Sequence, residues 1–123
     1  MTWLSVMLGG GLGAGLRHGA NLAALRWLGP NYPYGTLAVN VVGSALMGAL
    51  VAVLLARPQL APYRPFLATG LLGGLTTFST FSLDAVALWE RGDVGPAVVY
   101  VLVSLVLGIG GLVAGLSLAR LLV

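Results

Sequence analysis

Cysteine and lysine are both absent from this chain of 123 residues, and histidine occurs only once. Without cysteine the protein has no disulfide, no thiolate metal ligand and no nucleophilic thiol. Its three acidic residues and single histidine are too few for paired catalytic carboxylates or for a metal cluster of side chains. We therefore predict that the protein is not an enzyme.

Charged residues of any kind are scarce, at 7% of the chain, whereas hydrophobic residues make up 59%. A soluble domain carries about 25% charged residues, so the composition excludes a water-exposed globule and indicates a protein of the lipid bilayer. The net charge of +3 comes from arginines that stand singly along the chain, without a basic cluster. Nucleic acid is therefore not an expected partner.

Four apolar segments follow one another, each long enough for a membrane-crossing helix, which needs about 20 residues. They cover residues 3–28, 36–56, 66–89 and 97–123. Clusters of proline, glycine and charged residues separate them, and none shows the alternation of a barrel strand. We predict a single all-α domain over residues 1–123 with four transmembrane helices, the first being a retained helix and not a signal peptide.

Arginines near the helix ends are nearly balanced between the two sides of the membrane. Arg57, Arg64 and Arg120 fall on the side of the termini, and Arg26 and Arg91 fall on the other. Because such residues normally set the orientation, this chain has little bias toward one direction. Insertion both ways would allow an antiparallel pair of identical subunits; the alternative is that one arginine suffices to orient the chain.

The third segment carries the strongest signal, since GLLGGLTTFSTFSLD at 70–84 is a poor continuous membrane helix. Gly73 and Gly74, followed by Thr76 and Thr77, predict a break at mid-depth that frees carbonyl oxygens for a partner inside the protein. A hard cation such as sodium is one such partner. The alternative is a kinked but intact helix whose hydroxyls bond back to the preceding turn.

Polar residues recur every four positions in two other segments and therefore share one face of each helix. These are Thr36, Asn40, Ser44 and Gly48 in the second segment, and Tyr100, Ser104 and Gly108 in the fourth. Such faces meet protein or an ion path rather than lipid. Asn40 either joins two helices or lines that path.

Arg17 lies deep in the first segment. It either caps carbonyls of a neighbouring helix or acts on an ion directly, and both roles make the interior electropositive. Phe78 and Phe81 are ordinarily packing residues, but an aromatic ring edge carries a partial positive charge and can also line an anion path.

Three motifs together resemble the CrcB/Fluc family of small fluoride channels: GLGAGLRHG at 11–19, YGTLAVNVVGSALMG at 34–48 and GLLGGLTTFSTFS at 70–82. The resemblance implies a fluoride-selective channel that exports fluoride passively across the inner membrane of a bacterium and so relieves fluoride toxicity. It also implies an antiparallel, dual-topology homodimer with two pores at the dimer interface and a structural sodium ion on the two-fold axis.

The resemblance further assigns individual residues. The fluoride pore would be lined by Asn40, Phe78, Phe81, Tyr100 and Ser104, with Thr77, Ser79 and Thr80 as nearby hydroxyls. Main-chain oxygens of Gly73 and Thr76 from each subunit would bind the sodium ion, and Arg17 would lie near the aqueous vestibule. Gly108 departs from the family, because some relatives carry a further hydroxyl at that place.

Other transport functions need a buried carboxylate, and Asp84 is the one candidate. A dual-topology small multidrug exporter and a fluoride/proton antiporter are the alternatives of this kind. Asp84 is expected instead to cap the break or to pair with an arginine. A non-transporting assembly subunit would explain the many glycines but not the polar faces.

Overall fold

The structure is a computed structural model of residues 1–123, and every regular element in it is helical, which confirms the all-α prediction. In chain order the elements are α1 (Thr2–Leu28), α2 (Tyr34–Ala56), the 3-10 helix η1 (Pro58–Tyr63), the π-helical segment η2 (Pro65–Leu72), α3 (Gly73–Leu75), α4 (Phe78–Glu90) and α5 (Val94–Leu122).

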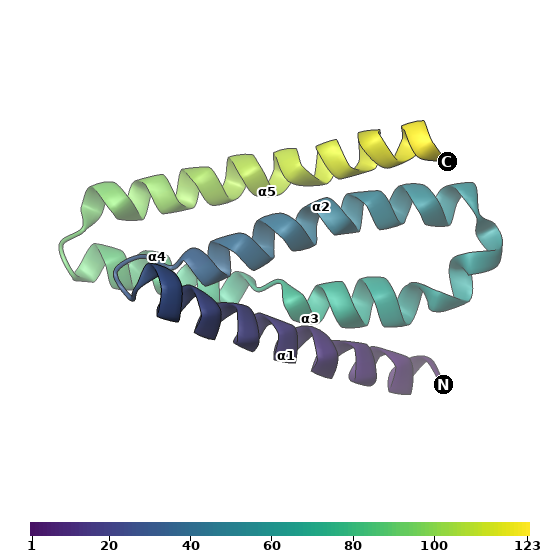
Figure 1. Ribbon diagram of the computed structural model, residues 1–123, viewed down its shortest axis with the longest axis horizontal. Coiled ribbons are helices and arrows are strands. Elements are labelled where there is room, and N and C mark those ends of the chain that lie inside the picture. Colours follow the sequence, from purple (N-terminus) through teal and green to yellow (C-terminus); the bar gives the residue numbers. More distant parts are fainter.

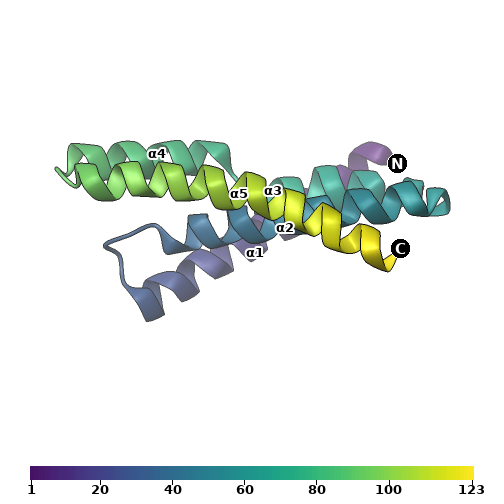
Figure 2. The same cartoon turned by 90° about the horizontal axis from the view of Figure 1, so that it is seen from above.

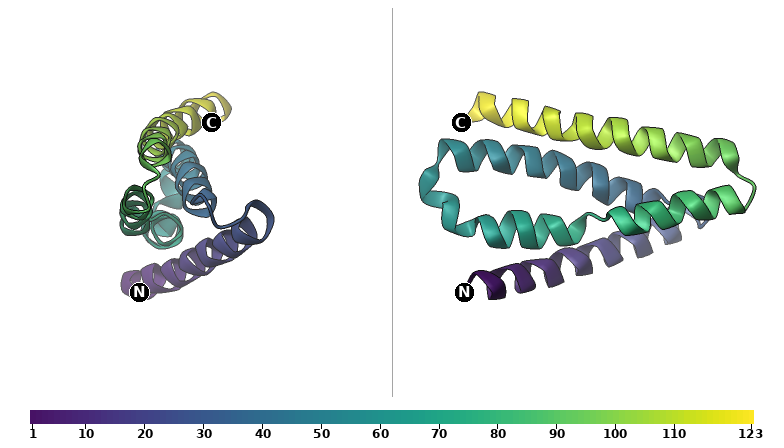
Figure 3. Two further views of the ribbon diagram at one scale, coloured as in Figure 1. Left: turned by 90° about the vertical axis from the view of Figure 1, so that its left-hand side faces the viewer. Right: turned by 180° about the vertical axis from the view of Figure 1, so that it is seen from behind.

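The long helices run up and down, so both termini lie at the same end of the molecule as η1 (Figure 1). The α1–α2 and α4–α5 connections lie at the other end. Toward that end α1 and the start of α2 diverge from α4 and α5 (Figure 2), and the end-on view shows an open arrangement rather than a closed bundle (Figure 3). The most extensive contacts between helices are those of α2 with α5 and of α1 with η2.

Three helical stretches are long and apolar enough to cross a membrane: Tyr34–Ala56, Pro65–Glu90 and Val94–Leu122. Helix α1 has a sufficient length of 27 residues. It falls short in hydropathy because it contains six glycines together with Arg17, His18 and Asn21. The expected span over α1 is therefore supported by length alone.

Little of the chain is buried within one subunit: 13 of 123 residues, of which only Tyr100 is a large side chain with no exposed surface. Many large apolar side chains are exposed on the surface of the subunit. A chain with so small an interior must find its remaining apolar contacts in lipid or in another subunit.

Glycines let α1 approach the first half of the third apolar stretch closely. A Cβ atom built on Gly9 would collide with the backbone of Phe66 and Leu71, and one built on Gly74 would collide with the backbone of Gly10. Small residues serve this purpose in membrane helices, where backbones meet at van der Waals distance. Gly11, Gly15 and Gly19 have no such role within the chain, because a Cβ atom added to any of them would have no neighbour within 4 Å.

We expect Gly13→Ala to destabilise the protein, because its new methyl group would collide with the backbone of Leu71 and Leu75. The loss should be about 1–3 kcal/mol, the usual effect of overpacking, and should appear as a lower melting temperature in detergent. Gly15→Ala is the matched control on the same helix and should not lower it. Equal melting temperatures for both variants would contradict this packing.

Candidate functional site

The third apolar stretch is interrupted between α3 and α4. Helix α3 ends at Leu75, and the backbone is extended at Thr76 (φ −87°, ψ 156°) and at Thr77 (φ −151°, ψ 127°) before α4 begins. Gly73 and Gly74 remain helical, so the interruption lies after the glycine pair. Thr77 is an effective N-cap for α4, since its Oγ1 accepts a hydrogen bond of 3.2 Å from the amide of Thr80.

Side chains from α1 and α2 bind the backbone around this interruption. Asn40 Oδ1 accepts from the amide of Thr77 at 2.8 Å, and Asn40 Nδ2 donates to the carbonyl of Thr77 at 3.0 Å. Arg17 Nε donates to the carbonyl of Gly74 at 3.2 Å. Arg17 therefore caps a backbone carbonyl, and Asn40 joins two helices as a membrane asparagine commonly does.

Two carbonyl oxygens at the interruption, those of Gly73 and Thr76, lack the hydrogen bond that an unbroken helix would give them. The amide of Thr77, which in a helix would donate to Gly73, donates to Asn40 instead, and the amide of Thr80, which would donate to Thr76, is used by the Thr77 hydroxyl. The chain has no group of three His, Cys, Asp or Glu side chains that could hold a metal. The freed carbonyl oxygens of Gly73 and Thr76 are hard-oxygen groups of the kind that could hold a cation such as sodium.

A groove of about 420 Å³ opens beside the interruption. It is lined by Asn40, Ser44, Gly73, Thr76, Thr77, Phe78, Phe81, Ser104, Leu105 and Gly108. The polar faces of α2 and α5 and the start of α4 therefore meet at one hollow. Within it, Ser104 Oγ is buried and has no hydrogen-bond partner.

The two phenylalanines form a tilted pair at the groove, with ring centroids 5.7 Å apart and an interplanar angle of 50°. Phe78 is 78% exposed, so its ring is not a core residue of this subunit. Phe81 also packs against Tyr100, with ring centroids 5.3 Å apart. Phe81 is therefore partly a packing residue of this subunit, whereas Phe78 is not.

A second cavity, of about 350 Å³, lies at the end of the molecule with the α1–α2 and α4–α5 connections. Its lining includes Thr80 and Asp84 from α4 and Tyr32 from the connecting loop. Asp84 Oδ2 accepts from the Tyr100 hydroxyl at 3.1 Å. The expectation that Asp84 caps the break or pairs with an arginine is wrong, since Tyr100 is its partner. In the loop, burial and, to a lesser degree, the neighbouring Tyr34 raise the pKa of Tyr32.

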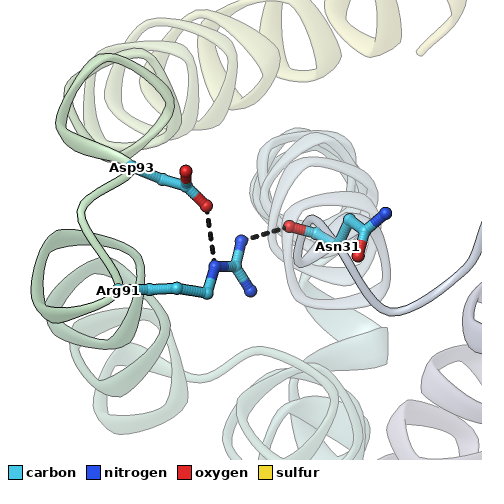
Figure 4. A network of polar contacts seen from close by, with 3 residues as sticks. All are labelled: Asn31, Arg91 and Asp93. Carbon is cyan, nitrogen blue, oxygen red and sulfur yellow. Dashed lines mark hydrogen bonds and ion pairs between the residues drawn. The ribbon is translucent and has the colours of Figure 1, made fainter.

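Arg91 ties the two connections together at this cavity (Figure 4). Its Nε lies 2.7 Å from Asp93 Oδ2, and one terminal nitrogen donates to the carbonyl of Asn31 at 2.7 Å. Both partners of the ion pair are about half exposed, so the pair contributes little to stability. The carbonyl bond holds the α4–α5 turn against the α1–α2 loop.

The structure divides the predicted site residues among several places. Five of the pore candidates line the groove: Asn40, Thr77, Phe78, Phe81 and Ser104. Thr80 lines the end cavity, Tyr100 lies fully buried beside Phe81, and Ser79 Oγ lies 3.4 Å from Thr77 Oγ1. Arg17 contacts Gly74 and is not among the groove residues.

The set of predicted site residues omits Ser44, although this serine lines the groove. Its position four residues after Asn40 is the signal that could have found it, because it places both side chains on one face of α2.

Residues 4–116 match the family described as CrcB-like protein, Camphor Resistance (CrcB). The chain is 54% identical to the fluoride-specific ion channel FluC of Mesorhizobium japonicum over 117 residues, which cover 95% of this chain and 94% of that protein. It is 54% identical over 117 residues to FluC of Cereibacter sphaeroides, covering 95% and 93%. It is 49% identical over 121 residues to FluC 2 of Nitrobacter hamburgensis, covering 98% of both.

Proposed function

This chain belongs to the CrcB family, and on that premise we propose that it is a fluoride-selective channel through which fluoride leaves the cell passively, relieving its toxicity. It is a multi-pass bacterial membrane protein and a transport protein rather than an enzyme. The observation that supports the proposal most is the groove, where unused hydrogen-bond donors and aromatic rings of three helices face one hollow.

The groove offers what a fluoride path requires. Fluoride is small and strongly hydrated, so a selective path needs closely spaced donors that replace its water. Asn40 uses one amide hydrogen on Thr77 and keeps a second, and Ser104 has a hydroxyl without a partner. With the electropositive edges of Phe78 and Phe81, these donors would bind fluoride and fit larger halides less well.

We propose that two antiparallel copies, each with four membrane spans, complete the pores at their interface. Three features support this: the groove is open in one chain, Phe78 is 78% exposed, and few residues are buried. The balanced arginines permit insertion in both orientations. The interruption at Thr76 and Thr77 would then lie within the bilayer, where the irregular backbone is shielded by protein.

Dual topology predicts labelling from both sides of the membrane. Because the protein has no native cysteine, a single cysteine at Gln59, in the η1 connection, reports orientation directly. We expect half of the molecules to react with an impermeant thiol reagent from each side. Adding lysines to one set of loops should force one orientation, and activity should then require a copy with the opposite bias. Labelling from one side only, in functional protein, would contradict dual topology.

We propose that the dimer holds one structural sodium ion on its two-fold axis. The carbonyl oxygens of Gly73 and Thr76, which lack their helical hydrogen bonds at the interruption, fit such a hard cation. Two copies would supply four oxygens. The ion would neutralise the partial negative charge of these oxygens and join the two subunits.

Sodium removal should therefore destabilise the purified dimer. After long dialysis into choline buffer we expect a lower melting temperature, restored by sodium chloride and not by choline chloride at equal ionic strength. Elemental analysis of protein kept in sodium should find one sodium per two chains. A sodium-free dimer with an unchanged melting temperature would contradict the proposal.

A fluoride/proton antiporter is the second candidate. Such a protein needs a carboxylate that can carry the proton, and Asp84 of α4, which lines the end cavity, is the one available. Proteoliposomes distinguish the two. A channel moves fluoride down its own electrochemical gradient whether or not a proton gradient is imposed. Fluoride accumulation driven by a proton gradient against the fluoride gradient, with the membrane potential clamped, would instead establish antiport.

A further inference from the structure

Ser44 lines the groove but is not one of the fluoride or sodium ligands proposed for this chain. It follows Asn40 by one turn of α2, lines the groove together with Ser104 and Gly108 of α5, and lies next to Gly108. Helices α2 and α5 form the most extensive contact in the molecule. The packing of α2 against α5 therefore fixes the position of Ser44, which does not lie on a loop.

The Ser44 and Ser104 hydroxyls are both unused. Ser104 Oγ is buried and has no partner, and Ser44 Oγ takes part in none of the hydrogen bonds of the chain. By contrast, Thr76 Oγ1 and Ser82 Oγ donate to the carbonyls four residues earlier, at 3.0 and 2.9 Å. A buried hydroxyl without a partner is unfavourable, so Ser104 Oγ indicates a ligand. Ser44 is half-buried at the same groove, and its free hydroxyl can reach a ligand bound there.

Gly108 of α5 lies beside Ser44 of α2 and supplies no hydroxyl of its own. The polar spacing of Tyr100 and Ser104 on α5 would continue at position 108, but glycine has no side chain there. A Cβ atom built on Gly108 would have Ser44 Oγ as its only neighbour, at 3.9 Å. The Ser44 hydroxyl therefore lies in contact with the position that a side chain of residue 108 would take.

We propose that Ser44 is a fluoride ligand, which with Ser104 forms a binding position one turn beyond Asn40 and replaces from α2 the donor that α5 lacks at Gly108. This inference rests on the proposed fluoride channel. A hydroxyl donates one short hydrogen bond to a small anion and fits a large halide less well. Ser44 is thus a specificity-determining residue of the path.

Ser44→Ala is the first test, because removing a hydroxyl that has no protein partner breaks no hydrogen bond of the fold. We expect fluoride efflux from proteoliposomes to fall about tenfold, as for the loss of one charge-assisted hydrogen bond. The fluoride-induced rise in the melting temperature should shrink as well. Ser117→Ala makes the same change at an exposed serine of α5 outside the groove, and should leave both readouts unchanged.

A relocated hydroxyl is the second test. Gly108→Ser in the Ser44→Ala background should restore both fluoride readouts, whereas Gly108→Ala in that background should not. Wild-type efflux and binding in Ser44→Ala, or failure of Gly108→Ser to restore them, would overturn the role of Ser44. If the protein binds fluoride in a way that depends on Ser44 but does not conduct it, the proposed channel function is wrong, while the role of Ser44 as a fluoride ligand is retained.

Discussion

Replacing Phe78 with isoleucine should reduce fluoride efflux about a hundredfold, comparable to removing one anion-stabilising group from a preorganised site. Isoleucine keeps much of the apolar volume but has no electropositive ring edge. Because Phe78 is 78% exposed in its own subunit, the substitution leaves the packing within that subunit nearly unchanged, and the apolar volume that isoleucine keeps serves the contact with the partner. We therefore expect the dimer to elute normally and to melt near the wild-type temperature.

Phe66→Ile is the matched control, since Phe66 is the third phenylalanine of the chain and lies outside the groove. It should conduct like the wild type. Phe81→Ile should also lose flux, with an added stability loss of about 1 kcal/mol from its ring contact with Tyr100. Wild-type flux in Phe78→Ile and Phe81→Ile would assign both rings to packing and remove them from the path.

Asn40→Asp should abolish fluoride efflux and also lower the melting temperature. The carboxylate can still accept from the amide of Thr77, but its second oxygen would face the Thr77 carbonyl without a hydrogen between them. An unmet hydrogen bond of this kind costs about 1–3 kcal/mol. The added negative charge would also repel the anion at the groove, so the loss of flux should exceed the loss of folded protein.

Asn31→Asp makes the same chemical change at an exposed loop residue and should conduct normally. Efflux is measured per folded dimer, so that the two effects of Asn40→Asp are separated. Wild-type flux per dimer in this variant would show that Asn40 lies off the fluoride path.

Helix boundaries could be predicted from the sequence because proline, glycine and charge clusters end each apolar segment. The largest difference is at the fourth segment, which the sequence predicts to begin at residue 97, whereas α5 begins at Val94. Its cause is local: Gly95 and Pro96 are tolerated in the first turn of a helix, where an amide has no intrahelical partner.

The position of the interruption could be predicted only approximately, because it depends on contacts between helices. Gly73 and Gly74 favour a break by local propensity, but Gly74 stays helical and packs against Gly10. The extended residues are instead Thr76 and Thr77, the second of which Asn40 binds from α2. Likewise, the pairing of Asp84 with Tyr100 links residues 16 positions apart and belongs to tertiary structure.

The most direct test of the central claim is a paired measurement of fluoride and chloride efflux from proteoliposomes containing the purified protein. Efflux is started with a potassium ionophore, and each anion is followed with an ion-selective electrode. We expect rapid fluoride efflux and chloride efflux no greater than that of protein-free liposomes, because the donors of Asn40, Ser44 and Ser104 replace the water of the smaller anion. Comparable rates for the two anions, or no protein-dependent fluoride efflux, would contradict a fluoride-selective channel.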